Sequence, residues 1–296
     1  GGPASRLTKL PMAQINLNKL ADNSVEILVK IPWEEVEKEY QKTLEELQKE
    51  ATLPGFRKGK APKAQVEKSV SKEKIYQEVI EQLVPRLYQE AVTSQKINPI
   101  ISPKVELIAA QEGKDWEIKF TTAEKPEVSL GNYQEEIKKI NTKGKIWTPG
   151  EEKEKTAAEK EREEQEKLAQ MVEALLKNSQ VTLPAILLEN DVNQRLAGLI
   201  EKTEKLGLTL EQYLASLGKT VAEIRREYEE ESRRNWQLEL ILAKIADEEK
   251  ITVSDEEIDQ FITQAPQEDQ KALGQQRYLV AAMLRQQKTL NFLKNL

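Results

Sequence analysis

The sequence predicts an α+β N-terminal domain followed by an elongated all-α C-terminal domain. Up to about residue 140, apolar residues recur both with the period of two typical of strands and with helical spacing, whereas after about residue 168 only helical spacing is found. Charged residues make up 32% and hydrophobic residues only 38% of the 296 residues. Such a composition predicts thin cores and much exposed surface, and a chain of this length fits two domains.

Two missing residue types exclude much chemistry. The chain contains no Cys and no His, which excludes disulfides, thiolate or imidazole metal sites and a Ser-His-Asp triad. Carboxylates, Lys, Ser, Thr and Tyr remain possible, but a polar helix boundary explains Ser71-Lys72, polar helix faces explain the paired glutamates, and Asp255 with Asp259 lacks the spacing of a calcium loop. We therefore expect no catalytic residues, no metal and no cofactor.

The apolar segments are short. The longest apolar run has seven residues, 278–284, against the roughly 20 that span a bilayer, and residues 1–11 lack the apolar core of a signal peptide. These observations favour a cytoplasmic protein without membrane contact. Met12 resembles a native start, and the residues before it are either a cloning remnant or an ordinary tail.

The N-terminal domain begins with a predicted strand pair and a helix. Alternating apolar residues over 25–31 predict a strand, and Ile15 with Leu17 predicts its partner. Residues 21–24 have the composition of a turn. Helical spacing then extends over 33–50, directly after a proline that suits the first turn of a helix.

A second helix and a second hairpin complete this domain. Residues 53–62 contain two Pro and two Gly and interrupt the helical pattern. Helical spacing resumes at Ser71 and continues to Ala91, with a kink expected at Pro85. Residues 105–108 and 116–120 then predict strands around a turn.

A run of Glu, Lys, Ala and Arg over 151–167 separates the two predicted domains. It lacks the apolar repeat of a coiled coil, so a solvated helix or a charged linker is favoured. We expect an α+β domain over 12–140, the charged segment over 141–167, and a helical domain over 168–296.

The helical domain carries clear start signals. Pro184 opens one helix, and three capping-box pairs announce helices at about 210–216, 221–247 and 255–264: Thr209 with Gln212, Thr220 with Glu223, and Ser254 with Glu257. The last helix is predicted over 275–294. Its apolar run at 278–284 is either deeply buried or kept exposed for a partner, and burial is favoured.

The stretch at 53–63 carries the most informative side chains. Residues 56–63 contain four cations and no acid. The flanking Gly and Pro residues predict a solvent-exposed tip that also exposes Phe56. Composition alone leaves open a plain solvated turn or a tip that docks on an anionic partner with an apolar notch. The glycine spacing is one residue short of a phosphate-binding loop, and Ala61 lacks the metal-binding hydroxyl, so nucleotide binding is rejected.

The eight residues 55–62, Gly-Phe-Arg-Lys-Gly-Lys-Ala-Pro, resemble the signature loop of trigger factors, the bacterial ribosome-associated chaperones. The order of strand pair, helix, loop, helix and strand pair is also similar to that family. More loosely, residues 181–188 and 254–258 resemble the starts of helices in the family's C-terminal domain. The resemblance covers roughly 14–140 and 168–296. It implies a ribosome contact through a set of loop residues: Gly55, Phe56, Arg57, Lys58, Gly59 and Lys60.

The resemblance implies an ATP-independent chaperone that docks at the exit tunnel of the large ribosomal subunit and shields apolar segments of nascent chains. Its implied partners are ribosomal protein, with ribosomal RNA as a further contact, and unfolded or nascent polypeptides; a homodimer of the free protein is left open. The family usually carries a peptidyl-prolyl isomerase domain, for which residues 141–167 leave no room. That domain is either naturally absent or was deleted, so no enzyme activity is expected.

Two other functions remain as alternatives. A periplasmic chaperone of the SurA type has a related helical domain, but the basic loop and the absence of a signal peptide speak against it. A prolyl isomerase would need the domain for which the chain has no room. Ribosome co-sedimentation separates the first alternative, and a proline-peptide isomerisation assay separates the second.

Overall fold

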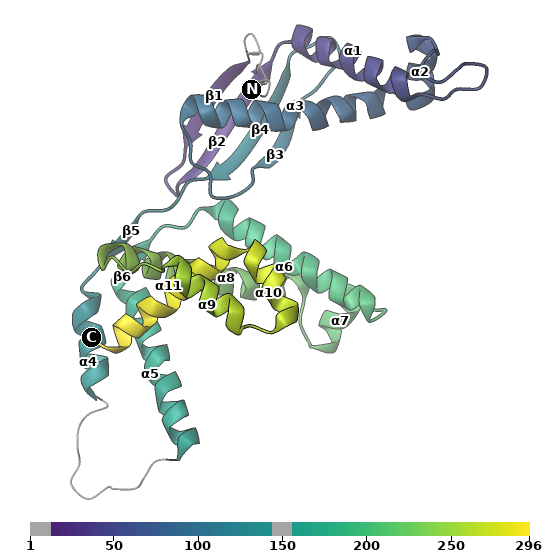
Figure 1. Ribbon diagram of the computed structural model, residues 1–296. Coiled ribbons are helices and arrows are strands. Elements are labelled where there is room, and N and C mark those ends of the chain that lie inside the picture. The colour runs from purple at the N-terminus through teal and green to yellow at the C-terminus, as the bar shows by residue number, and fades with distance from the viewer. Residues whose placement is uncertain (1–12, 144–155) are drawn as a thin grey trace, which may run out of the picture. The chain divides into compact units, whose positions relative to one another are not determined.

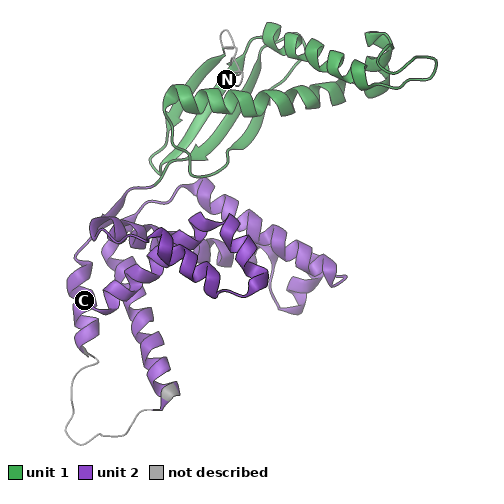
Figure 2. Ribbon diagram, in the orientation of Figure 1, with its two compact units in different colours: residues 1–125 green, residues 126–296 purple. Residues whose placement is uncertain are grey.

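The computed structural model describes residues 13–143 and 156–296. The chain forms two compact units that divide after Lys125 (Figure 2). Met12, which the sequence suggests as a native start, lies outside the described residues, as do residues 144–155 of the expected charged segment. Unit 1 is the α+β part and unit 2 is mainly helical, which confirms the predicted fold class.

Unit 1 contains four strands and three helices among its described residues (Figure 1). In chain order they are β1 (Gln14–Lys19), β2 (Ser24–Ile31), α1 (Trp33–Glu50), α2 (Lys63–Val70), α3 (Lys72–Gln95), β3 (Lys104–Ala109) and β4 (Trp116–Ala123). Both predicted hairpins and both predicted helices are confirmed. The short helix α2 was not predicted, and α3 continues through Pro85 without ending there.

The four strands form one antiparallel sheet in the order β1-β2-β4-β3. The register places Ile27 opposite Phe120 and Val29 opposite Ile118, so these side chains share one face. That face is buried against apolar residues of α1 and α3. The opposite face carries half-buried polar side chains such as Glu26 and Lys119. One-sided burial of this kind is the usual arrangement in antiparallel sheets.

An ion pair with a buried carboxylate joins α1 to α3. The Glu39 carboxylate lies 3.2 Å from Arg86 and 3.0 Å from Lys42. Burial by itself raises the pKa of Glu39, but the hydrogen bonds and charges of Lys42 and Arg86 together outweigh it and hold the pKa below the ordinary 4.5. The pair therefore links α1 to α3, and both the loop and α2 lie between these two helices in the chain.

Unit 2 contains eight helices and two short strands among its described residues. In chain order they are β5 (Val128–Leu130), α4 (Tyr133–Lys143), α5 (Ala157–Asn178), β6 (Ser179–Val181), α6 (Ala185–Lys205), α7 (Leu210–Ser216), α8 (Val221–Glu248), α9 (Asp255–Gln264), α10 (Gln267–Gln275) and α11 (Arg277–Lys294). The two-stranded β5–β6 sheet is a departure from the all-α expectation. The longest helix, α8, packs against α5, α6, α7 and α11.

The three predicted capping boxes are present in unit 2. The hydroxyls of Thr209, Thr220 and Ser254 each accept a hydrogen bond from the backbone N–H three residues later, and the Gln or Glu at that position accepts one in return. The helices that they open begin where the sequence predicts. The short helix α10 was not predicted, and consequently the last helix begins at Arg277 rather than at residue 275.

The boundary between the units lies earlier than residue 140. Tyr133 and Ile137 of α4 are buried in one apolar cluster with Met171 and Leu175 of α5 and with residues of α8 and α11. The Asn141 side-chain amide donates a hydrogen bond to the Leu293 carbonyl at 3.0 Å. Residues 126–143 therefore belong to the helical unit. The described part of the charged run forms the start of α5, whose side chains over 158–166 are exposed.

The junction of β5 with α5 leads to a stability prediction. An added Cβ on Gly131 would lie 2.2 Å from the Asn178 carbonyl oxygen, whereas one on Gly198, inside α6, meets no atom within 4 Å. We expect Gly131→Ala to destabilise unit 2 by about 1–3 kcal/mol through overpacking. Gly198→Ala should stabilise it by about 0.5–1 kcal/mol, because alanine favours the helix.

Amide hydrogen exchange of the full chain, read separately for peptides of unit 2, measures both changes. The two alanine variants serve as controls for each other because they add the same methyl group to the same unit. Equal effects of the two substitutions would contradict the placement of residues 126–143 against α5.

Candidate functional site

A loop joins α1 to α2 and contains all six residues that the sequence predicts as a docking site. The backbone N–H of Phe56 donates to the Leu53 carbonyl at 3.1 Å, and that of Lys60 donates to the Arg57 carbonyl at 2.9 Å. These bonds fold the loop into two successive tight turns. In Figure 1 the loop lies at the end of unit 1 where α1 and α2 meet, beyond the sheet.

The base of the loop is closed by hydrogen bonds and burial. The Gly59 N–H donates to the Ala51 carbonyl at 3.1 Å, and the Gln48 side-chain amide donates to the Ala61 carbonyl at 2.7 Å. Ala61 is fully buried. The two ends of the loop are therefore held together while the residues between them project into solvent.

Two glycines shape the tip for different reasons. Gly55 has φ +82° and Gly59 has φ +74°, which is the left-handed region that L-residues avoid. An added Cβ on Gly55 would meet no atom within 4 Å, whereas one on Gly59 would lie 2.9 Å from the Lys49 carbonyl oxygen. Glycine is therefore required at position 55 only because of its backbone conformation. At position 59 it is required for the conformation and also because a side chain would collide with α1.

The exposed side chains of the tip combine one aromatic ring with three cations. Phe56 is 43% exposed, and Arg57, Lys58 and Lys60 are exposed as well. In the described part of the chain, no carboxylate lies within the 4.0 Å ion-pair distance of these three cations, whereas the neighbouring Lys63 pairs with Glu45 at 2.7 Å. Such a tip can insert a ring into an apolar notch and neutralise acidic or phosphate groups around it.

The short helix α2 is the part of this site that the sequence reasoning missed. Its Val66 is fully buried in the core of unit 1, and its Glu67 carboxylate accepts a hydrogen bond from the Tyr40 hydroxyl of α1 at 2.7 Å. These contacts anchor the C-terminal side of the loop. The available signal was Pro62, a suitable helix start, with valines at helical spacing after it.

Unit 2 exposes apolar side chains near the start of α11. Tyr278 is 84% exposed, and Leu279 and Met283 are also exposed, while Val280 is buried. The expectation that the run 278–284 is buried is therefore wrong for most of its residues. The run is apolar nearly all round the helix, but only the side that carries Val280 is covered.

A second exposed apolar group surrounds α7. It lies at the ends of α6 and α8 and in the turns that connect them to α7, and Leu206 is its most exposed member at 68%. Its members are Ile200, Leu206, Leu208, Leu217 and Val221. The sequence feature that could have predicted this exposure is leucine next to a glycine at a turn, as in Leu206-Gly207-Leu208 and Leu217-Gly218. The run Ile186-Leu187-Leu188, by contrast, is buried.

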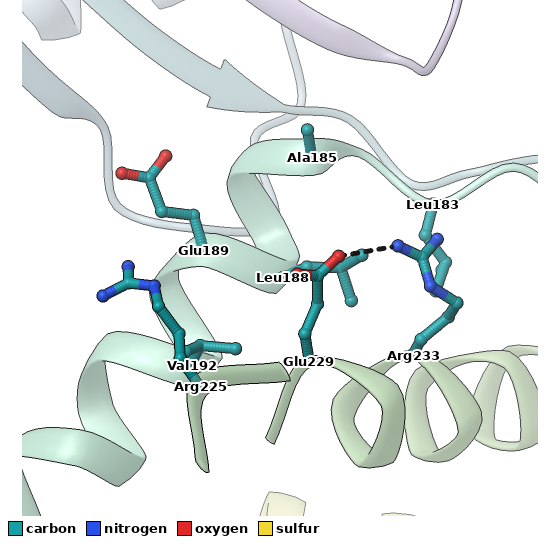
Figure 3. A pocket seen from close by; sticks show the side chains of 8 residues that line it. All are labelled: Leu183, Ala185, Leu188, Glu189, Val192, Arg225, Glu229 and Arg233. Carbon is teal, nitrogen blue, oxygen red and sulfur yellow. Dashed lines mark hydrogen bonds and ion pairs between the residues drawn. The ribbon is translucent and has the colours of Figure 1, made fainter. Parts of the chain in front are cut away.

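A cavity of about 320 Å³ lies between α6 and α8 (Figure 3). Buried apolar side chains form its floor and charged side chains of both signs surround it, with Arg233 and Glu229 paired at 2.9 Å. Its lining residues are Leu183, Ala185, Leu188, Glu189, Val192, Arg225, Glu229 and Arg233. No group of acidic side chains suited to a metal ion occurs among the described residues. Within the same residues, no helix is long and apolar enough to cross a membrane.

Comparison with known proteins matches almost the whole chain to one family. A family model described as "Bacterial trigger factor protein (TF)" matches residues 13–159, and a second, "Bacterial trigger factor protein (TF) C-terminus", matches residues 151–296. A solved structure described as "Promiscuous Substrate Recognition in Folding and Assembly Activities of the Trigger Factor Chaperone" shares the fold. Its TM-score is 0.61 at 15% identity, over 95% of this chain and 99% of that chain.

Individual relatives match to different extents. A trigger factor from Desulforudis audaxviator is 38% identical over 116 residues, which are 39% of this chain and 26% of that protein. One from Carboxydothermus hydrogenoformans is 26% identical over 420 aligned positions that cover 95% of this chain and 98% of that protein. Since this chain has 296 residues, the latter relative contains segments without a counterpart here.

The two loop glycines allow a matched test of the tip geometry. Both Gly55→Ala and Gly59→Ala place an alanine in the left-handed backbone conformation, which should lower the free energy of unfolding by about 1–2 kcal/mol. Only Gly59→Ala also places a methyl group against the Lys49 carbonyl, so its cost should be larger by about 1 kcal/mol or more. Hydrogen exchange at the end of α1 should therefore speed up in Gly59→Ala and stay unchanged in Gly55→Ala. Faster exchange there in both variants would contradict the close approach of Gly59 to α1.

Proposed function

The chain belongs to the trigger factor family of chaperones, and on that premise we propose that it docks at the exit tunnel of the large ribosomal subunit and shields nascent chains. The observation that carries this proposal is the closed loop with an exposed Phe56 and three cations without a carboxylate partner among the described residues. Ribosomal RNA and ribosomal proteins both offer the anionic groups that such a loop suits. We place the activity in the cytoplasm, where nascent chains emerge.

Unit 2 is proposed to be the client-binding part. Two separate apolar groups, at the start of α11 and around α7, remain exposed in a unit whose core is complete without them. Contacts with such small patches are individually weak, so a client segment can be covered and then released without ATP. The mechanism needs no catalytic group.

No enzyme activity is part of the proposal. Family members are usually prolyl isomerases as well, but residues 144–155, between α4 and α5, are too few to form a domain with its own core. The segments of the Carboxydothermus relative without a counterpart here agree with a shorter chain. The protein then acts as a holding chaperone alone.

Removal of the exposed loop side chains tests the docking proposal. The triple variant Phe56→Ala, Arg57→Ala, Lys58→Ala should reduce co-sedimentation with ribosomes about tenfold or more, because it removes the aromatic anchor and two cations. Its helicity should not change, since an exposed loop contributes little packing. Binding of the parent chain should weaken as salt rises.

The matched control for the triple variant is Leu20→Ala with Lys114→Ala. These two residues are an exposed leucine and an exposed lysine at other turns of unit 1. The control should bind ribosomes like the parent. If the triple variant also binds like the parent, the loop is not the docking site.

Polar substitution of the exposed residues of α11 tests the client surface. Tyr278→Ser with Leu279→Gln should weaken the suppression of aggregation of an unfolded protein, which requires near-stoichiometric chaperone because nothing turns over. The melting temperature should hardly change, because exposed substitutions cost at most about 0.5 kcal/mol.

The fully buried Ile245 provides the contrasting variant. Ile245→Ala should lower the melting temperature through a loss of about 2–5 kcal/mol, and aggregation suppression should fall with it. Unchanged suppression in the α11 variant would remove α11 from the proposed client surface.

A further inference from the structure

The edge strand β3 presents an unpaired backbone. It pairs with β4 on one side, and the described part of the chain contains no strand that pairs with its other side. Every second residue of an edge strand points its N–H and C=O groups away from the sheet. Only another extended polypeptide offers donors and acceptors at the matching spacing along such an edge.

The apolar residues of β3 lie on the core face of the sheet but are not covered. The register places Val105 opposite Phe120 and Leu107 opposite Ile118, whose side chains are fully buried. Val105 is nevertheless 42% exposed and Leu107 45% exposed. The apolar face of the sheet therefore extends to β3, beyond the part that α1 and α3 cover.

The opposite edge of the same sheet does not share this property. In β1, the apolar residues Ile15 and Leu17 face Val29 and Ile27, and both are half-buried against the core of unit 1. The exposed apolar strip is thus specific to the β3 edge. The Tyr88 ring of α3 lies 5.4 Å from the ring of Phe120, the residue opposite Val105 in the register.

The other face of β3 begins with charged side chains, and the apolar Ile108, which is 54% exposed, follows at the register shift. Glu106 pairs with Lys119 of β4 at 2.6 Å, and Lys104 lies two residues away on the same face. An added strand would meet apolar side chains on one face and, over residues 104–106, charges of both signs on the other. A partner with the complementary pattern has apolar residues at every second position and Lys or Glu between them.

We propose that β3 is a binding edge for extended client segments with alternating apolar and charged residues, which add to the sheet as a fifth strand. This inference rests on the proposed chaperone function and gives unit 1 a client site of its own, in addition to the loop. The edge is short, because a register shift interrupts the pairing between Leu107 and Ala109. Short pairing makes each capture weak and reversible, as release without ATP requires.

The test uses the full chain and a fluorescein-labelled peptide of about eight residues that alternates valine with lysine and glutamate. Fluorescence anisotropy should show binding to the parent chain. The variant Val105→Lys with Leu107→Lys should bind the peptide about tenfold more weakly or worse, because two apolar contacts are replaced by charges. Leu20→Lys is the matched control, since Leu20 is equally exposed in the same unit, and it should bind like the parent.

Two further peptides, methylated on opposite edges, separate strand addition from simple apolar contact. Methylation of the backbone nitrogens at alternate residues removes the hydrogen-bond donors of one edge and leaves the side chains unchanged. Of the two methylated patterns, the one that blocks the pairing edge should abolish binding. Equal binding of both methylated peptides and the parent peptide would overturn the proposal, as would unchanged binding by the double lysine variant.

Two further measurements show which molecule binds the edge and distinguish a failure of this proposal from a failure of the proposed chaperone function. If sedimentation shows a dimer of the parent chain that the double lysine variant loses, the edge serves a second copy instead, and the client assignment is overturned. Ribosome co-sedimentation and the effect of the α11 substitutions should be the same in the double lysine variant as in the parent. Failure at β3 is thereby distinguished from failure of the proposed function.

Discussion

The packing of α1 and α3 on one face of the β1-β2-β4-β3 sheet is the constraint on which unit 1 depends. Apolar residues at helical spacing in both helices meet the alternating residues of β2 and β4 in one core, and the Glu39–Arg86 pair joins the helices to each other. An α1 of 18 residues is about 27 Å long. It therefore carries the loop that follows it away from the sheet, where the backbone closure by Gly59 and Ala61 holds the tip open to solvent.

The same packing leaves the β3 edge uncovered. The inward residues of β2 and β4 are fully buried under the two helices, whereas Val105 and Leu107 of β3 stay more than 40% exposed. The register shift in β3 and the charged Lys104 and Glu106 limit uncontrolled pairing along this edge, as in other natural edge strands. The sheet thus has an accessible edge that is short and partly charged.

In unit 2 the helix α8 has the organising role that the sheet has in unit 1. It contacts α5, α6, α7 and α11, so the core is a set of small clusters along one helix. A chain with 38% hydrophobic residues completes such clusters and still leaves leucines at the α7 turns and an apolar start of α11 exposed. Polar helix faces and ion pairs such as Arg285–Asp247 cover the remaining surface. Exposed apolar groups on a stable frame are the physical requirement for holding unfolded chains.

Features that depend on neighbours along the chain could be predicted from the amino-acid sequence alone. The period of two over 25–31, the capping boxes at Thr209, Thr220 and Ser254, and the Gly-Pro interruption at 53–62 are local, and each is confirmed because local hydrogen bonds and backbone preferences decide it. All six residues proposed for docking were named from one such local segment. Features that depend on packing between distant segments became visible only in the fold. The fold assigns residues 126–143 to the helical unit, because α4 shares a core with α5, α8 and α11. The fold also leaves Tyr278, Val105 and Leu107 exposed. An apolar pattern in the sequence shows which face of an element is suited to burial, but it does not show whether another element packs on that face.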